Sequence, residues 1–542
     1  MRRPFLRAVL DPALVEAILP TGSFYRFLAE NVARVASDDV VGGLFSDANG
    51  RQSALAPEYY VALILLRYHD DVSYQVASER AQYDGRWRMV LGKPPTSIPT
   101  PIVSAASLQE FEDLLRRRGR HDALLQRTIT MARENGVLPR EVTTAQDSTP
   151  ITGRGAVKDT YNLLGDGLRR LLRSLAKVQG EKPLAVAERY GVGELFRRST
   201  KAAAGIDWSS PDARRGFLQR LVETAEAVIA RASQDASNVG IEPAVASAIA
   251  IIRKVIEQDV ERHKDGTVSI RIGVAPDRLI SIHDPEMRRG HKSQSEPFEG
   301  YKLHHTAEVT SGIVMAIEVT GANVHDSVPS EPMAERAEQS SGCIVEKVIG
   351  DAAYGTEANR VAHDEVGRIL VAKLPRPRPT ARFSKQHFKI DLQQNTVTCP
   401  SGNTTAEFTR VRRRRKHDDD PADRELMQRF SFDARVCGGC TARAQCVPNG
   451  EKKRRVDVGP NEKLLQDARQ YALDPQFQAD RTARQMAERT VARFVQLGAR
   501  QARVRGRAKV AAQMTIIAAL VNLTRLHKLA VHADRIPWPV AV

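Results

Sequence analysis

The chain has 542 residues, 42% of them hydrophobic and 27% charged, which is ordinary for a folded globular protein. It contains 35 Gly and 28 Pro, close to average, which excludes a collagen-like or wholly disordered protein. At roughly 150 residues per domain, this length predicts about three or four structural units. Lys and Arg number 81 against 65 Asp and Glu, a formal net charge of +16 that favours a polyanionic partner, nucleic acid first.

Residues 1–135 are predicted to be helical and to form an N-terminal DNA-binding domain. Apolar side chains between Pro57 and Val76 recur at three- to four-residue steps, which is typical of helices with one buried face. Short helices joined by tight breaks suit a DNA-binding module and equally suit a plain helical bundle, so periodicity alone leaves both interpretations open.

Strand patterns are split into two parts by a helical segment. Within residues 136–157, the β-branched run that starts at Val142 is predicted as a strand ending at Asp147. Residues 158–265 return to helical periodicity and are predicted as an insertion. Residues 266–375 continue the sheet, with strands predicted at 268–272, 279–282, 301–309, 313–319, 344–349 and 369–372. The fold class is therefore α/β, followed by a basic, Cys-containing insertion (376–460) and C-terminal helices (461–542).

Three acidic residues occupy positions that suit two-metal phosphoryl transfer, in which carboxylates hold a pair of divalent cations. Asp147 and Asp351 each follow a predicted strand, and Glu488 lies on a late helix with Arg484 one turn before it. An Asp at a strand end is commonly only a turn residue, and 65 acidic residues give many chance triads. Asp284 also follows an apolar stretch and is the rival for the first carboxylate.

Several short motifs occur in a fixed order along the chain. They are Asp147-Ser-Thr, Asp284-Pro-Glu-Met, Phe298-Glu-Gly-Tyr301-Lys302, Thr320-Gly-Ala-Asn323-Val-His-Asp326, Gly350-Asp351-Ala-Ala-Tyr354-Gly355, Arg484-x-x-x-Glu488, Gly498-Ala-Arg500, Arg505-Gly506-x-x-Lys509 and Asn522-Leu523. Taken together, these motifs resemble bacterial insertion-sequence transposases of the DDE class. Residues 1–120 look like the InsH-type helical domain that precedes the catalytic core in this group.

The resemblance implies an RNase H-like core, a five-stranded mixed sheet flanked by helices. It assigns the catalytic, metal-binding carboxylates to Asp147, Asp351 and Glu488, which would hold two Mg²⁺ or Mn²⁺ ions. Asp147 is preferred over Asp284 because the family's Asp-Pro-Glu segment follows the first catalytic Asp. Arg481 and Val495 stand where the family often has Tyr and Lys.

The resemblance also implies a reaction and partners. The enzyme would cleave the ends of an insertion sequence and join the freed 3′-OH to target DNA. Its partners would be double-stranded DNA, both terminal inverted repeats and target, and further copies of the chain in a synaptic complex. Two alternatives are a metal-dependent nuclease on the same fold and a non-catalytic DNA-binding protein derived from a transposase. No apolar run reaches the roughly 20 residues of a spanning helix, so no membrane partner is expected. The expected location is the bacterial cytoplasm, in association with the nucleoid.

Four of the five cysteines cluster late in the chain, at Cys399, Cys437, Cys440 and Cys446. The Cys437-Gly-Gly-Cys440 spacing suits a turn around Zn²⁺, and the other two thiols would complete a closed structural site. A reducible disulfide and unreacted thiols are the alternatives. Cys343 falls in the predicted core.

Basic residues follow Glu488 along the predicted C-terminal helices, where one face is expected to track DNA phosphates. These residues, with Arg484 before them, are Arg489, Arg493, Arg500, Arg503, Arg505, Arg507 and Lys509. The alternative is an ordinary solvated charged face.

Overall fold

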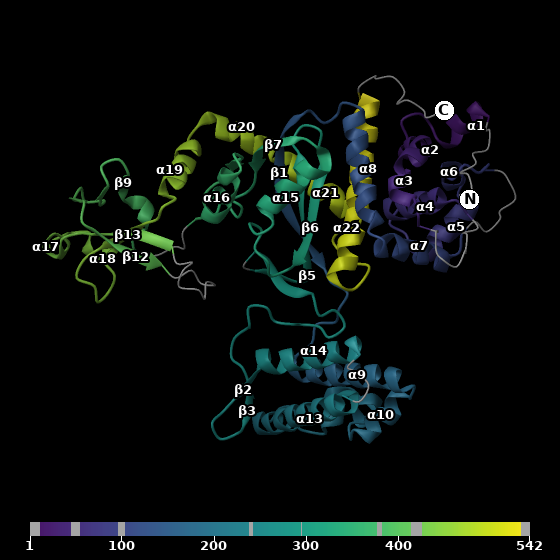
Figure 1. The fold of residues 1–542 in the computed structure, drawn as a ribbon, viewed down its shortest axis with the longest axis horizontal. Helices are drawn as coiled ribbons and strands as arrows, with labels where there is room; N and C mark the ends of the chain where they lie inside the picture. Colours follow the sequence, from purple (N-terminus) through teal and green to yellow (C-terminus); the bar gives the residue numbers. More distant parts are fainter. Residues whose placement is uncertain are drawn as a thin grey trace.

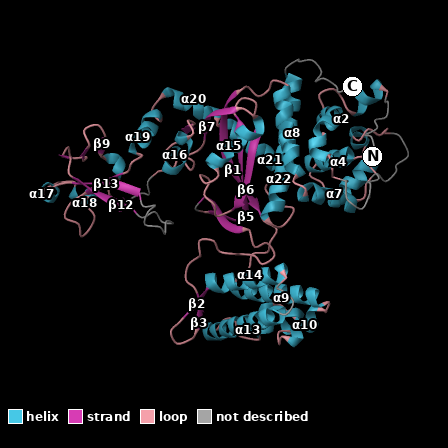
Figure 2. Ribbon diagram, in the orientation of Figure 1, coloured by secondary structure: helices cyan, strands magenta, loops and turns pink. Residues whose placement is uncertain are grey.

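The computed structural model describes residues 11–44, 55–95, 103–237, 242–293, 295–376, 382–413 and 425–532. Its helices and strands form a helical N-terminal part, a central mixed sheet, a separate helical bundle and a small β-rich module (Figures 1 and 2). The bundle interrupts the sheet after its first strand, and the β-rich module is inserted before the last helices.

The N-terminal part is built from helices that Ser or Asp side chains cap at several N-termini, among them Ser23, Ser73, Asp84 and Ser104. Its central helix, α4, is buried on almost every side, and the others pack around it. The helices are α1 (Pro12–Ile18), α2 (Phe24–Val35), α3 (Asp38–Val41), α4 (Pro57–His69), α5 (Tyr74–Tyr83), α6 (Gly85–Val90), α7 (Ala105–Arg117) and α8 (Arg120–Glu134).

The central sheet has the order β4-β5-β1-β7-β8, with β6 pairing β5 as well. Its strands are β1 (Glu141–Thr152), β4 (Arg288–Ser293), β5 (Glu296–Glu308), β6 (Val314–Gly321), β7 (Ile344–Ile349) and β8 (Ile369–Val371). β1 runs antiparallel to β5 and parallel to β7, and β8 continues the parallel side. The sheet is thus mixed, as predicted, but it has six described strands instead of five, because β4 adds to the first part of β5.

The first strand is longer than the sequence predicts. β1 does not end at Asp147 but continues to Thr152, because β5 pairs with it over its whole second half. Its parallel partner β7 stops earlier, at the pair Ala145–Ile349. Asp147 therefore lies within the strand. It pairs with His305 of β5 on one side, and no residue of β7 pairs with it on the other.

Helices cover both faces of the sheet. α15 (Ser330–Ser341) and α16 (Glu357–Glu365) pack beside β6, β7 and β8, and the buried Gln146 of β1 bonds to Ser330 on this face. α21 (Gln485–Gln496) and α22 (Arg507–His532) cover the other face.

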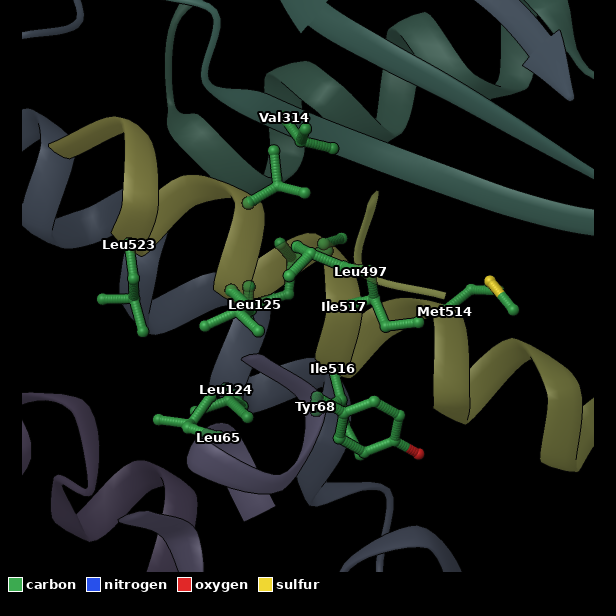
Figure 3. Close-up of a cluster of buried hydrophobic side chains, with 14 of the residues drawn as sticks. Leu65, Tyr68, Leu124, Leu125, Val314, Leu497, Met514, Ile516, Ile517 and Leu523 are labelled. Atoms are coloured by element: carbon green, nitrogen blue, oxygen red, sulfur yellow. The ribbon is translucent and has the colours of Figure 1, made fainter. Parts of the chain in front are cut away.

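α22 joins the sheet to the N-terminal helices. Its side chains Ile516, Ile517 and Leu523 lie between Val314 of the sheet and Leu65 of α4 (Figure 3). By length and composition, the segment Arg507–Val531 could cross a membrane, so the prediction that no segment is that long is wrong for the described residues. In this structure it is a core helix, because 61% of its apolar 18-residue stretch is buried inside the protein.

The insertion between β1 and β4 forms a helical bundle with its own hydrophobic core, and it lies below the sheet in Figure 1. Its elements are α9 (Thr160–Gln179), α10 (Pro183–Arg189), α11 (Glu194–Arg197), α12 (Thr200–Ala204), α13 (Pro211–Ser237), α14 (Pro243–Asp259), β2 (Val260–Arg262) and β3 (Val268–Ile270). The strand predicted at 279–282 is a loop instead. Leu279 and Ile282 are apolar because they pack into the bundle core. The side chain of Gln258 donates a hydrogen bond to the Leu279 carbonyl and accepts one from the Leu279 amide.

Residues 382–413 and 425–458 form the small β-rich module, whose strands the sequence prediction missed. Its elements are η1 (Lys385–His387), β9 (Lys389–Asp391), β10 (Thr396–Thr398), β11 (Thr404–Thr405), β12 (Phe408–Arg413), β13 (Glu425–Ser431), α17 (Ala434–Gly438), α18 (Arg443–Cys446) and β14 (Arg455–Val458). Two helices, α19 (Glu462–Tyr471) and α20 (Pro475–Ala483), lead from this module back to the sheet (Figure 1).

Candidate active site

Two neighbouring parallel strands bring Asp147 and Asp351 together. The last registered pair of β1 and β7 is Ala145–Ile349, and each aspartate lies two residues beyond its member of that pair. Side chains two residues apart in a strand point to the same face, so Asp147 follows Ala145 toward the face that α21 covers. Asp351 begins a turn at the end of β7, where its Oδ1 accepts a hydrogen bond of 2.7 Å from the amide of Ala353.

The carboxylate of Asp147 is mostly buried, with 22% of its side chain exposed. Burial raises its pKa, whereas a hydrogen bond from the Ser148 amide (2.8 Å) and the charge of Arg484 lower it. The charges of Asp351 and Glu488 raise it further, and the result is a pKa of about 6. Asp351 and Glu488 therefore both lie within electrostatic range of Asp147.

Packing of α21 on the sheet positions Glu488. Ala487, which precedes it, is fully buried in a small cluster with Ala145 and Ile349. This contact holds the first turn of α21 beside the two strands that carry Asp147 and Asp351. The Glu488 side chain itself is 55% exposed.

Arg484 links the acidic residues. Its guanidinium lies 2.5 Å from Glu488 Oε1 and 4.0 Å from Asp147 Oδ2. The sequence predicts one continuous helix here, but α20 ends at Ala483 and α21 starts at Gln485, with Arg484 at the junction. The four-residue spacing of Arg484 and Glu488 still brings the two side chains into an ion pair.

A cleft of about 540 Å³ opens beside these residues. Asp351 and Arg484 line it together with the segment that follows β8 and with Arg481 of α20. Asp351 is the one carboxylate of the three that lines this cleft, and Lys373, Arg376, Arg481 and Arg484 line it as well. The cleft therefore offers positive charge to a polyanionic substrate beside Asp351.

Tyr354 is a site residue to which the sequence prediction gave no role. Its ring is almost fully buried, and its hydroxyl has no hydrogen-bond partner among the described residues. Burial raises the pKa of Tyr354 well above its ordinary value, and the charges of Asp326, Asp147 and Asp351 act in the same direction. The hydroxyl thus remains a neutral donor close to the acidic residues. Gly350 leaves room for it, since a Cβ there would lie 2.7 Å from the Tyr354 side chain.

Asp284, the rival first carboxylate, has a different role. It is fully buried and accepts hydrogen bonds from Tyr301 Oη (2.5 Å) and from the Gly506 amide (3.2 Å). Tyr301 pairs with Ile151, four residues beyond Asp147 along β1. Asp284 therefore fastens the loop before α22 to the sheet and is not part of the acidic cluster.

The acidic cluster has the chemistry of a divalent-cation site. Three carboxylates are the ligands that Mg²⁺ prefers, and burial of Asp147 beside two like charges makes its ionised form costly. A cation would offset that cost, so the residues fit such an ion. Among the described residues, no three His, Cys, Asp or Glu side chains are grouped closely enough to form a ready-made metal shell, and Glu488 is paired with Arg484 instead.

The basic residues after Glu488 do not form one helical face. The chain leaves the helix at Leu497 and re-enters it at Arg507, because residues 500–502 pair with the end of β1 through Thr152. Arg500 and Arg505 lie exposed on this loop. Arg503 is held by Asp71 and stacks over Tyr68, so its role is structural.

A smaller basic cluster lies between α21 and α22. The pKa of Lys528 is lowered mainly by the charge of Arg493 and less by burial. The pKa of Arg525 is lowered mainly by burial and less by the charge of Arg489. These cations therefore act on one another's charge, and a surface region of one sign of charge attracts anions. Arg489 and Arg493 were predicted, whereas Arg525 and Lys528 were missed because they follow the apolar stretch of α22. Arg507 and Lys509 are exposed at the other end of that helix.

The four late cysteines meet in the β-rich module. Cys399, Cys437, Cys440 and Cys446 all line one small cavity, and none of the five cysteines forms a disulfide. Cys343 is buried in the main core, as predicted.

Comparison with known protein families gives one match. The family model described as a transposase DDE domain matches residues 398–527. This segment contains Glu488 and the four clustered cysteines, whereas Asp147 and Asp351 precede it. No curated protein matches the chain. The match supports a DDE-class transposase and suggests an enzyme that acts on nucleic acid.

Proposed function

We propose that this chain is a DNA transposase that cleaves the ends of an insertion sequence and joins the freed 3′-OH to target DNA. The observation that carries the proposal is the register of β1 and β7, which sets Asp147 beside Asp351, with Glu488 and Arg484 against them. The family match at residues 398–527 includes α21 and so supports the assignment of Glu488 as the third carboxylate.

The sheet supports an RNase H-like interpretation of the catalytic core. Its series β6-β5-β1-β7-β8 comprises a three-stranded antiparallel meander followed by two parallel strands, and β4 is an addition at one end. In this interpretation residues 158–265 are an insertion into the core. Residues 1–135 are the N-terminal domain that we expect to contact DNA.

Asp147, Asp351 and Glu488 would hold two Mg²⁺ or Mn²⁺ ions. When bound, such ions would polarise the phosphodiester and stabilise the charge that develops on the attacking and leaving oxygens. The protein residues would supply ligands from a rigid sheet and from one helix, so the substrate phosphate would meet a preorganised site.

Arg484 has two roles in this proposal. In the described structure it holds the Glu488 carboxylate and partly neutralises Asp147. On DNA binding its guanidinium is placed to bind a phosphate, and Glu488 would then turn toward the two aspartates. Tyr354, whose hydroxyl has no acceptor among the described residues, would donate a hydrogen bond within the same acidic cluster.

DNA would be held by basic surfaces beside the site. Arg489, Arg493, Arg525 and Lys528 form the cluster between α21 and α22, and Arg500 and Arg505 extend from the loop between these helices. Cutting and joining two DNA ends requires both ends in one complex, so a homo-oligomer is expected. The expected location of this complex is the bacterial cytoplasm.

The proposal is tested by a strand-transfer assay with the purified chain, Mg²⁺ or Mn²⁺, supercoiled target DNA and duplexes that carry the terminal repeats of its own element. Joined products with wild-type protein are expected. Cleavage without joined product would indicate a nuclease, and DNA binding without cleavage would indicate a non-catalytic relative; either result would overturn the proposal.

A further inference from the structure

The β-rich module, described at residues 382–413 and 425–458, has a very small hydrophobic core. Among these residues nine buried side chains form it, and two of them are Cys437 and Cys446. A core of this size rarely stabilises a fold without a disulfide, a metal or a partner. None of the cysteines is in a disulfide, so the module needs another source of stability.

The four thiols of the module come from three places in the chain and line one cavity. Cys399 lies at the start of a tight turn in which the Gly402 amide bonds to the Cys399 carbonyl. Cys437 and Cys440 flank the end of α17, and Cys446 ends α18. Cys446 is within electrostatic range of the other three thiols.

The cavity that the four cysteines help to line has the size of a single ion or water molecule. Its volume is about 20 Å³, and a site needs roughly 10–15 Å³ to hold one water. The described residues that line the cavity include four cysteines and no Asp or Glu, so the site suits a soft cation and does not suit Mg²⁺ or Ca²⁺.

Two arginines supply positive charge beside the cavity. Arg443 bonds to the carbonyl of Cys437 (3.1 Å), and Arg454 bonds to the carbonyl of Cys446 (3.0 Å). The Nε of Arg454 is buried and has no acceptor among the described residues. Four thiolates around one divalent cation carry a net charge of −2, which these guanidinium groups would balance.

We propose that Cys399, Cys437, Cys440 and Cys446 bind one Zn²⁺ ion, and that this ion stabilises the module. Each coordinating thiol releases its proton to solvent, and four sulfur ligands leave no open position, so the role is structural. No three of these side chains are grouped closely enough to hold a metal ion in the described structure, so zinc binding would require the thiols to turn into the cavity that all four line.

The β-rich module is connected to the active site through α19. Lys385 pairs with Glu462 of α19, and Gln466 of α19 bonds to the carbonyl of Ile390 (3.0 Å). α19 leads through α20 to Arg484 and Glu488. Loss of zinc should therefore loosen the segment that leads to α21 without removing any carboxylate.

The test measures zinc in the full-length protein purified from zinc-supplemented culture, by elemental analysis. About one zinc per chain is expected in the wild type and in Cys343→Ser, and loss of more than about 80% of it in Cys437→Ser/Cys440→Ser. Because the double variant could misfold, a second measurement uses wild-type protein alone. Stepwise modification of its thiols by a mercurial, read with a chromogenic zinc indicator, should release zinc in step with the clustered thiols.

Two results would overturn the proposal. One is a folded wild-type protein that contains no zinc and binds neither Zn²⁺ nor Co²⁺ on titration. The other is a disulfide between clustered cysteines, found by mass spectrometry of a non-reduced digest in place of metal. Neither result bears on Asp147, Asp351 and Glu488, so the zinc proposal can fail without the proposed function failing.

Discussion

Asp147 and Asp351 are 204 residues apart in the chain, yet each lies two positions beyond the last registered pair of two adjacent parallel strands. This relationship gives two carboxylates one shared edge, and the packing of Ala487 on the same strands adds Glu488.

Replacement of either aspartate should abolish DNA cleavage and leave DNA binding intact. Asp147→Asn and Asp351→Asn keep the side-chain volume but remove a ligand charge, and rate losses of about 10³-fold or more are expected for removal of a group that acts only in the reaction. Cleavage kinetics and gel-shift affinity are the measurements. Asp364→Asn, at an exposed position on α16, serves as the matched control and should behave as wild type.

The cluster between α21 and α22 should contribute to DNA affinity without sequence preference. Lys528→Ala and Arg493→Ala should each weaken binding and reduce the slope of log K against log salt by about 0.9 for every phosphate that the variant no longer neutralises. Titrations at several salt concentrations measure this slope. Lys463→Ala removes an exposed lysine of α19 that pairs with Asp467, and an equal effect from that variant would contradict a specific role for the cluster.

Two glycines in helices of the bundle should respond oppositely to alanine. A Cβ at Gly165 would lie 2.0 Å from Thr200 Oγ1, so Gly165→Ala should cost about 1–3 kcal/mol by overpacking. At Gly216 the nearest atom is Arg220 Nη1 at 3.6 Å, so Gly216→Ala should stabilise by about 0.5–1 kcal/mol through helix propensity. Thermal unfolding of the bundle transition measures both, and equal signs would refute the close packing of α9 against α12.

Asn522 should be essential for stability. Its amide donates to Thr128 Oγ1 (3.0 Å) and to the Val314 carbonyl (2.9 Å), and its Oδ1 accepts from the Val314 amide (2.7 Å). Asn522→Ala leaves these buried groups unpaired and should lower the free energy of unfolding by about 2–4 kcal/mol. Thr524→Ala, which loses one bond to its own helix, should cost much less in the same denaturant titration.

Asp70 should make the N-terminal helices sensitive to acid. Its burial raises its pKa, but hydrogen bonds from His69, Tyr25 and Trp87 outweigh burial and lower it to about 2, from 3.8. A folded-state pKa below the unfolded value means that the stabilisation, about 2 kcal/mol, is present above about pH 4 and is lost as the pH falls toward 2. Unfolding free energies of wild type and Asp70→Asn should therefore converge over that range. A difference that stays constant with pH would contradict this.

The sequence predicted the elements of the site better than their arrangement. The bounds of β7 and the contact of Arg484 with Glu488 follow from apolar pattern and helical spacing, both of which are local. The pairing of β1 with β7 depends on strands almost 200 residues apart, so no local pattern could set its register.

Other errors have equally physical causes. Leu279 and Ile282 resemble a strand because they are buried, although what they bury against is a helical bundle. The strands of the β-rich module were missed because charged residues occupy their exposed faces, as at Arg410 and Arg412 of β12. The basic run 412–416 lies partly outside the described residues. Tyr354 stood in a recognised motif, but only its burial beside three aspartates indicates a role.

The central claim, that Asp147, Asp351 and Glu488 hold divalent cations together, is tested most directly by iron-mediated cleavage of the protein. Fe²⁺ bound in place of Mg²⁺ reduces added hydrogen peroxide to hydroxyl radicals, which cut the nearby backbone, and the fragments can be mapped by mass spectrometry. We expect cuts close to all three positions, suppressed by excess Mg²⁺ and absent in Asp147→Asn. Cuts confined to one position, or unchanged in that variant, would contradict the claim.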